Sequence, residues 1–193
     1  MKKIKIKSIG NYLFPVPTVI VGSIVDGKPT FNTLGNFGLM ALSPLTIYIS
    51  GFAKHYTMIG IKENGRFSAN IPSSGQVIET DYVGLVSGHR KDKSKVFEVF
   101  FGEQETVPLI SECPVNMSCR VIKQFMVGRM EVSVAVVEEL FVDEDCISND
   151  KADLEKINPL ALYHDRTYRG MGKIAGKSFK IGKEYKDWKE KSA

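Results

Sequence analysis

Three short polar segments of the chain could together bind a phosphorylated planar heterocycle. The first covers residues 32–37 and reads Asn-Thr-Leu-Gly-Asn-Phe. Its amides, its hydroxyl and its exposed backbone N–H groups could hydrogen-bond to the edge of such a ring. The alternative is an asparagine-rich loop whose side chains satisfy their own backbone.

The second segment, residues 50–57, reads Ser-Gly-Phe-Ala-Lys-His-Tyr-Thr and is expected to run from a strand end into the start of a helix. Hydroxyls, basic groups and the free N–H groups of a helix N-terminus suit a phosphate. The alternative is simple helix capping by Thr57 beside a solvated Lys54.

The third segment, residues 87–93, places Ser87 and Gly88 ahead of several basic residues. Such a loop could complete an anion site or neutralise a reduced cofactor. The alternative is an ordinary charged loop between two helices.

The elements that must position these segments are mostly strands. A β-branched run over residues 18–25 precedes Asp26-Gly27, a strong tight-turn signal, and Pro29 marks the returning strand as an edge strand. The expected strands cover residues 18–25, 29–33, 44–50, 66–71, 117–125 and 129–137, with a turn near Gly128. The expected helices cover 57–65, a segment from Ser74 to Gly84 or Gly88, and 92–101, while the acidic stretch 138–155 is expected to be a surface loop. This pattern predicts a mainly β fold, a closed or partly open antiparallel barrel with a few short helices.

The sequence lacks the motifs of several other kinds of functional site. The chain has no P-loop and no nucleophile elbow, and residues 170–176 miss the spacing of a dinucleotide fingerprint. The three histidines lie far apart, and the three cysteines form no C-x-x-C pair, so neither a metal site nor a disulfide framework is expected.

Length and charge limit the class of protein. The chain has 193 residues, which fits one domain, and it contains no apolar stretch long enough to span a membrane. The basic N-terminus lacks the apolar region of a secretory signal, so a cytoplasmic protein is expected.

The net charge of +4 lies in residues 173–193, which hold seven lysines against three acids. A nucleic-acid module using this tail is the weaker alternative, because the rest of the chain is electrically neutral.

The three polar segments occur in an order and spacing that resemble the flavin reductase-like, FMN-binding split-barrel family, and within it the flavoredoxins. The resemblance covers about residues 12–175. The motifs that carry it are Pro15-Val16-Pro17, Asp26-Gly27-Lys28, Asn32, Ser43-Pro44, Tyr56-Thr57, Ile61, Gly65-x-Phe67-x-x-Asn70-Ile71-Pro72, Gly84-x-x-Ser87-Gly88, Asp92-Lys93, Glu112-Cys113-Pro114, Tyr163-His164 and Tyr168-x-x-Met171-Gly172.

The resemblance implies a Greek-key split β-barrel over residues 1–175, a basic tail over 176–193, and a homodimer with one FMN per subunit near its interface. By matching positions, the implied flavin-binding residues are Asn32, Thr33, Asn36 and Phe37 along the ring, Ser50, Gly51, His55 and Thr57 at the phosphate or ribityl chain, Ser87, Gly88 and Lys93 closing the site, and Tyr163 and Tyr168 over the ring. Because a nearby cation favours a more negative flavin, Lys93 is the expected tuning residue.

The implied function is an oxidoreductase that passes electrons from NAD(P)H, or from a redox protein, through bound FMN to an acceptor. The alternative is a flavoredoxin-type electron carrier, or a flavin-binding protein, without nicotinamide turnover. Neither function requires a metal, a nucleic-acid partner or a membrane.

Overall fold

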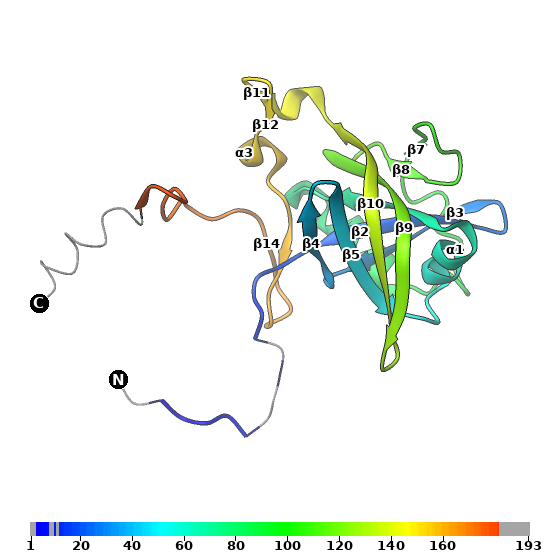
Figure 1. Cartoon of the computed structure of the whole chain (residues 1–193), viewed down its shortest axis with the longest axis horizontal. Helices are drawn as coiled ribbons and strands as arrows, with labels where there is room; N and C mark the ends of the chain where they lie inside the picture. The colour runs from blue at the N-terminus through cyan, green and yellow to red at the C-terminus, as the bar shows by residue number, and fades with distance from the viewer. Residues whose placement is uncertain (1–2, 8–9, 11, 182–193) are drawn as a thin grey trace, which may run out of the picture.

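A seven-stranded antiparallel sheet forms the body of the protein (Figure 1). The computed structural model describes residues 3–7, 10 and 12–181. Neighbouring strands follow the order β3-β2-β6-β9-β10-β5-β4. Their bounds are β2 Val19–Val25, β3 Lys28–Leu34, β4 Phe37–Leu42, β5 Leu45–Phe52, β6 Arg66–Ile71, β9 Val115–Val127 and β10 Met130–Val142. The predicted mainly β split barrel with few short helices is confirmed.

Short helices and two-residue strands surround this sheet. Helix α1 (Tyr56–Asn64) lies against β2, and α2 (Val77–Leu85), which follows the 3-10 turn η1 (Ser74–Gln76), lies against β3. A small sheet has the order β1-β13-β14. The remaining elements are β1 Val16–Pro17, β7 Val99–Phe100, β8 Leu109–Ile110, η2 Glu144–Cys146, β11 Ile147–Ser148, β12 Lys151–Ala152, α3 Leu154–Ile157, β13 Ala161–Leu162 and β14 Tyr168–Arg169.

The first hairpin forms as predicted. Asp26 and Gly27 both have positive φ, of 50° and 73°, which is the conformation of the tight turns that match strand twist. Val25 pairs with Lys28 across this turn. Pro29 lies on β3, an edge strand of the sheet, where its missing N–H leaves no gap in the ladder.

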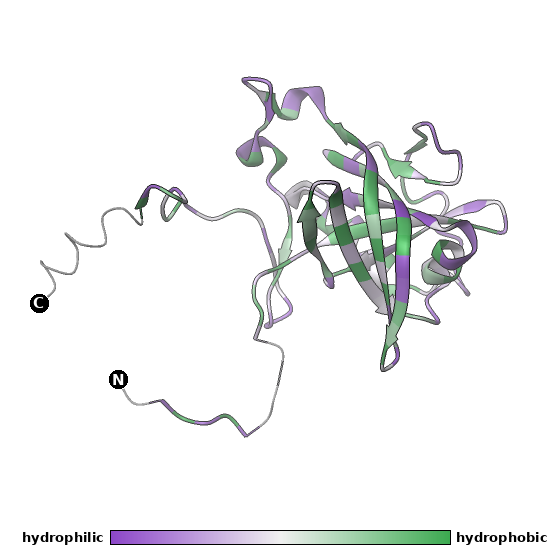
Figure 2. Ribbon diagram, in the orientation of Figure 1, coloured by the Kyte–Doolittle hydropathy of each residue, from purple (hydrophilic) through white to green (hydrophobic). Residues whose placement is uncertain are grey.

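The core has two parts, one on each face of β2. Val19 and Val21 point into the barrel with Phe67 and Ile49, whereas Ile20 points outward into a second cluster beneath α2. Because both faces of β2 are covered, its sequence, Val-Ile-Val-Gly-Ser-Ile-Val, places apolar residues on both faces instead of alternating. Figure 2 shows this apolar character along the barrel strands, with hydrophilic residues at the turns around β11 and β12.

The long hairpin of β9 and β10 extends further than the sequence pattern indicates. Gly128, with φ of 59°, makes its turn as expected. Residues 138–142 continue β10, because β9 begins at Val115 and supplies partners up to Val142. The prediction of a surface loop over 138–155 is therefore wrong for its first part.

One further prediction is wrong, and one strand is missing from the expected set. The expected helix over 92–101 is a loop ending in β7, because Phe97 enters the second core cluster and Val99 pairs with Ile110. Tertiary contacts there outweigh helix propensity. Strand β4 is absent from the expected strands; it pairs with β5 from Phe37 to Leu42.

The described terminal segments lie away from the barrel on one side (Figure 1). Residues 3–7 and 171–181 are all exposed. Most of the predicted basic tail, residues 182–193, lies outside the described residues, so the predicted domain boundary at 175 stays a prediction. Within the described part of the chain, none of the helices combines the length and the apolar character that crossing a bilayer requires.

Candidate functional site

A cavity of about 140 Å³ brings residues of all three polar segments together. Asn32 reaches it from β3, His55 and Thr57 from the start of α1, and Ser87 from the loop after α2. We call this cavity the polar pocket. Its lining consists of Asn32, Lys54, His55, Tyr56, Thr57, Gly84, Leu85, Val86, Ser87, Gly88 and Lys93.

The N-terminus of α1 opens onto the polar pocket. The helix begins at Tyr56, and the His55 carbonyl accepts the N–H groups of Met58 and Ile59. The N–H groups of Tyr56 and Thr57 have no hydrogen-bond acceptor among the described residues. Unpaired N–H groups and the positive end of the helix dipole together favour an anion at this position.

Thr57 lies inside the first turn of α1 and does not cap it. His55 occupies the capping position and makes no side-chain capping hydrogen bond, so the prediction of Thr57 as N-cap is wrong. Thr57 is 2% exposed and lines the polar pocket. A hydroxyl in this position can donate a hydrogen bond to a ligand in the pocket.

His55 is held in the pocket as a neutral imidazole. The amide nitrogen of Asn32 lies 3.0 Å from Nδ1 of His55. Because the amide nitrogen can only donate, Nδ1 is the acceptor and Nε2 carries the proton. Burial, followed by the positive charges of Lys93 and His89, lowers the pKa of His55 below its usual 6.5. His55 therefore adds a neutral N–H donor to the pocket.

Lys93 contributes a fixed positive charge from beneath the pocket. Its side chain is 4% exposed, and Nζ donates to the carbonyls of Phe31 at 2.9 Å and Val83 at 2.6 Å. Burial lowers the pKa of Lys93 to about 8, so the amine is mostly charged at neutral pH. Since Val83 lies in the last turn of α2, the ammonium also joins the end of that helix to β3.

A second hollow, of about 310 Å³, adjoins the polar pocket through Gly84 and Leu85. Thr33 and Tyr168 line it, and we call it the linking hollow. The Tyr168 hydroxyl donates to Asp81 at 3.1 Å. Burial and then this hydrogen bond raise the pKa of Tyr168 to about 12. The linking hollow therefore presents a neutral phenol together with the Asp81 carboxylate that accepts its hydrogen bond.

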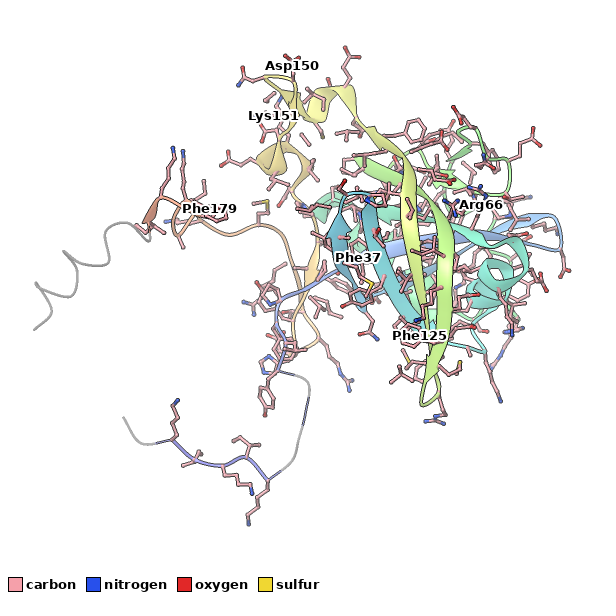
Figure 3. All side chains as sticks on the ribbon, in the orientation of Figure 1. Phe37, Arg66, Phe125, Asp150, Lys151 and Phe179 are labelled. Carbon is pink, nitrogen blue, oxygen red and sulfur yellow. The ribbon has the colours of Figure 1, made fainter. Side chains whose placement is uncertain are left out.

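A third hollow, of about 630 Å³, adjoins the linking hollow at Gly35. Residues 13–17, which precede the barrel, line one side of it, and strands β4, β5 and β10 line the other. Asn36, Phe37 and Ser50 line it with mostly apolar neighbours, so we call it the apolar hollow. Figure 3 shows Phe37 on β4 at this wall of the barrel. Its other lining residues are Leu13, Phe14, Pro15, Val16, Pro17, Gly35, Tyr48, Val127, Met130 and Val132.

Two predicted binding residues line none of these hollows. Gly51 is buried, and a Cβ at its position would lie 3.0 Å from the Met58 sulfur. The ring of Tyr163 stacks under the Arg169 guanidinium at 4.5 Å. In the other direction, Gly84, Leu85 and Val86 line the polar pocket without having been predicted to bind. Their position directly before Ser87 is the sequence signal that could have revealed them.

Metal and thiol chemistry find no support in the described residues. In that part of the chain no three His, Cys, Asp or Glu side chains cluster closely enough to hold a metal ion. Cys113 and Cys119 are fully buried, and burial raises the pKa of both thiols, to about 12 for Cys113. Reactive cysteines need a stabilised thiolate, so these residues act as small core side chains.

Similarity to known proteins agrees with this geometry. The chain is similar to flavoredoxin from Methanosarcina acetivorans, with 38% identity, a TM-score of 0.92, and coverage of 96% of this chain and 100% of that chain. It is also similar to flavoredoxin of Desulfovibrio vulgaris, with 28% identity, a TM-score of 0.83, and coverage of 94% and 100%. An FMN-binding protein from Thermus thermophilus shares the fold at 19% identity, a TM-score of 0.79, and coverage of 92% and 99%.

The family-level comparison covers most of the chain. Residues 11–172 match the model of the flavin reductase like domain. This range contains the polar pocket and both adjoining hollows. The chain therefore belongs to the flavin reductase-like domain family.

Proposed function

We propose that this protein binds FMN and passes electrons through it between a donor and an acceptor. The observation that carries the proposal is the polar pocket, where three segments far apart in sequence place polar groups around one small cavity. In this proposal Thr57, Ser87, Gly88, the N-terminus of α1 and the Lys93 ammonium hold the phosphate. The ribityl chain and the ring lie against the other predicted ligands that line the hollows, namely Asn32, Thr33, Asn36, Phe37, Ser50, His55 and Tyr168. Gly51 and Tyr163 line none of the hollows, so neither contacts FMN in this proposal.

The residues fit a flavin monophosphate in two ways. The polar pocket offers the Thr57 hydroxyl, the first N–H groups of α1 and a buried ammonium, which is the donor set that a phosphate requires. The linking hollow adjoins the pocket through Gly84 and Leu85, and the apolar hollow adjoins the linking hollow at Gly35. The apolar hollow adds the mostly apolar surface that a planar ring requires.

Bound FMN would supply the redox chemistry, because flavins accept and release electrons singly or in pairs. The residues of this chain orient it and set its charge environment. Lys93 holds a positive charge that stabilises the more negative, reduced form and so raises the reduction potential. The neutral His55 orients a polar group without adding charge.

Absorption spectroscopy tests the binding proposal directly. Purified protein is expected to carry, or to take up on titration, one FMN per chain with a perturbed visible flavin spectrum. Protein that takes up no FMN would refute the proposal.

Two candidate functions differ in the source of the electrons that reduce FMN. The similarity to two proteins named flavoredoxin favours the electron carrier. In this proposal the carrier receives its electrons from a redox protein. A nicotinamide-dependent reductase would instead oxidise NADH or NADPH in the presence of FMN. Steady-state NAD(P)H oxidation separates them: we expect a bound, dithionite-reducible flavin with slow nicotinamide turnover, and rapid turnover would favour the reductase.

A homodimer is part of the proposal because of the edge strand β4. Leu39, Met40 and Leu42 on this strand are 58%, 57% and 78% exposed. An unpaired edge with exposed apolar side chains is a favourable surface for association. Sedimentation analysis is expected to give a dimer that Leu42→Glu dissociates, and a monomeric wild type would refute this part.

A further inference from the structure

A second charged cavity lies directly behind the polar pocket. It has a volume of about 340 Å³ and is formed by the β2–β3 turn and the loop 88–93. The two cavities share Tyr56, Gly88 and Lys93 as lining residues, so these residues form the wall between them. We call the second cavity the basic hollow. Its lining consists of Val25, Asp26, Lys28, Pro29, Thr30, Tyr56, Gly88, His89, Arg90, Lys91, Asp92 and Lys93.

The side chain of Tyr56 is braced on three sides. Its hydroxyl donates to the Asp26 carboxylate at 2.9 Å. The His89 ring meets the Tyr56 ring edge to face, with centroids 4.9 Å apart, and Nε2 of His89 lies 3.0 Å from the Lys54 carbonyl oxygen. On the remaining side, a Cβ added to Gly88 would lie 2.8 Å from the Tyr56 ring. The wall is therefore closed and tightly packed.

The basic hollow carries an excess of cations over acids. Lys28, Arg90 and Lys91 line it, whereas its acids are Asp26 and Asp92. Both acids are already engaged: Asp26 accepts from Tyr56, and Asp92 accepts from the Ser94 N–H at 2.8 Å and pairs with Lys28 at 3.7 Å. The free positive charge suits an additional phosphate.

The volumes set what each cavity can hold. The polar pocket, at about 140 Å³, is well below the roughly 300–1,000 Å³ typical of a drug-sized ligand, so it suits one small group such as a phosphate monoester. A flavin dinucleotide carries a second phosphate and a nucleoside beyond the first phosphate. With the wall closed, that extension has no path into the basic hollow.

We propose that Tyr56 is a specificity-determining residue that restricts the site to flavin monophosphates and excludes flavin dinucleotides. The inference rests on the proposed function. Opening the wall would join the polar pocket to the basic hollow, where Arg90 and Lys91 can receive the second phosphate.

Calorimetric titration of flavin-free protein with FMN and with FAD tests this inference. Wild-type protein is expected to bind FMN at least about tenfold more tightly than FAD, a difference of about 1.4 kcal/mol. Tyr56→Ala is expected to shift the ratio of FAD affinity to FMN affinity at least about tenfold in favour of FAD. Tyr82→Ala, which removes an exposed tyrosine of α2 that lines none of these cavities, is the matched control and is expected to leave both affinities unchanged.

Two further variants keep the test decisive. Adding Arg90→Gln and Lys91→Gln to Tyr56→Ala is expected to reverse the gain in FAD affinity. If circular dichroism shows that Tyr56→Ala does not fold, Tyr56→Phe decides instead, because it keeps the ring but releases it from Asp26, and a smaller gain in FAD affinity is expected.

Each remaining outcome has one meaning. Wild-type protein that binds FMN and FAD equally, or a Tyr56 variant that folds with an unchanged preference, overturns the role of Tyr56. Wild-type protein that binds neither flavin overturns the proposed function itself, and the two failures are therefore distinguishable.

Discussion

The polar pocket and the apolar hollow both adjoin the linking hollow but are built in different ways. In the polar pocket, charges and donors are fixed by hydrogen bonds across distant elements, as when Lys93 joins Phe31 and Val83 or Asn32 holds His55. In the apolar hollow, Phe37 and its neighbours offer surface with few fixed polar groups, beside the unpaired edge strand β4.

This difference separates two tasks of a ligand site. Fixed donors in a small cavity recognise a group of defined charge and size, because each unmet donor is costly. An open apolar surface gains free energy in proportion to the area that it covers and recognises shape less strictly. We therefore expect the polar pocket to dominate affinity and the apolar hollow to modulate it.

The largest effect should come from Thr57→Val in the polar pocket. Loss of a hydrogen bond to a charged phosphate costs about 1.5–3 kcal/mol, which corresponds to about a 10- to 150-fold weaker FMN affinity. Titration calorimetry measures the change, and Thr106→Val, at an exposed loop position, is the control. Unchanged affinity would remove Thr57 from the phosphate site and break the comparison.

The second largest effect should be a dependence of FMN affinity on pH, which arises from the charge on Lys93. An anionic ligand stabilises the ammonium, whose pKa is about 8 in the flavin-free protein, so FMN affinity should fall as pH rises above about 8, by at most about tenfold per pH unit. Lys93→Met should flatten this part of the profile. A profile equally steep in both proteins would contradict the role of Lys93.

Through the same residue, folding stability should depend on pH with the opposite sign to FMN affinity. Burial lowers the pKa of Lys93 from 10.5 to about 8, so the unfolded chain holds the proton more tightly between these values. The stability of the flavin-free protein should therefore gain a contribution from Lys93 as pH rises from about 8 to 10.5. Denaturant titrations of wild type and Lys93→Met over this range check the sign.

A smaller effect is expected in the apolar hollow. Phe37→Ala removes an aromatic contact worth about 0.5–1.5 kcal/mol beyond its area, so FMN affinity should weaken about 2- to 10-fold. Phe179→Ala, in the exposed terminal segment that Figure 3 shows far from the barrel, is the control. A loss larger than that of Thr57→Val would reverse the proposed ranking of the two regions.

The smallest effect is expected for Lys28→Ala. Lys28 and Asp92 form an ion pair at 3.7 Å with both side chains largely exposed, and such pairs contribute little. Neither the melting temperature nor FMN affinity should change measurably. A clear loss of affinity would show that this surface pair, and not buried Lys93, positions the loop 87–93.

Local signals in the sequence located several elements closely. Asp26-Gly27 and Gly128 make the expected turns, Gly65 ends α1 in the left-handed conformation, and the strand expected over 66–71 has those bounds in the structure. These features depend on a few consecutive residues, because a tight turn or a helix end is set by the φ values that they allow.

Elements that depend on distant partners were misread. The loop 92–101 has a pattern compatible with a helix, but Phe97 is drawn into a core cluster and Val99 into a strand pair. Strand β4 was missed for a local reason: it pairs with β5 directly across the Ser43-Pro44 turn, but its sequence, Phe-Gly-Leu-Met-Ala-Leu, has no β-branched residue to signal a strand. Local propensity is a weak prior wherever long-range pairing decides the conformation.

The sequence by itself determined the types and order of the polar groups at Asn32, Thr57 and Ser87, and the local turns that flank them. Only the tertiary structure decided that these groups share one cavity, that Lys93 is buried beneath it, and that Tyr56 closes its far side. The physical reason is that turn and strand preferences arise between neighbours in the chain. Burial, pKa shifts and cavity walls arise between residues that only the packed barrel brings into contact.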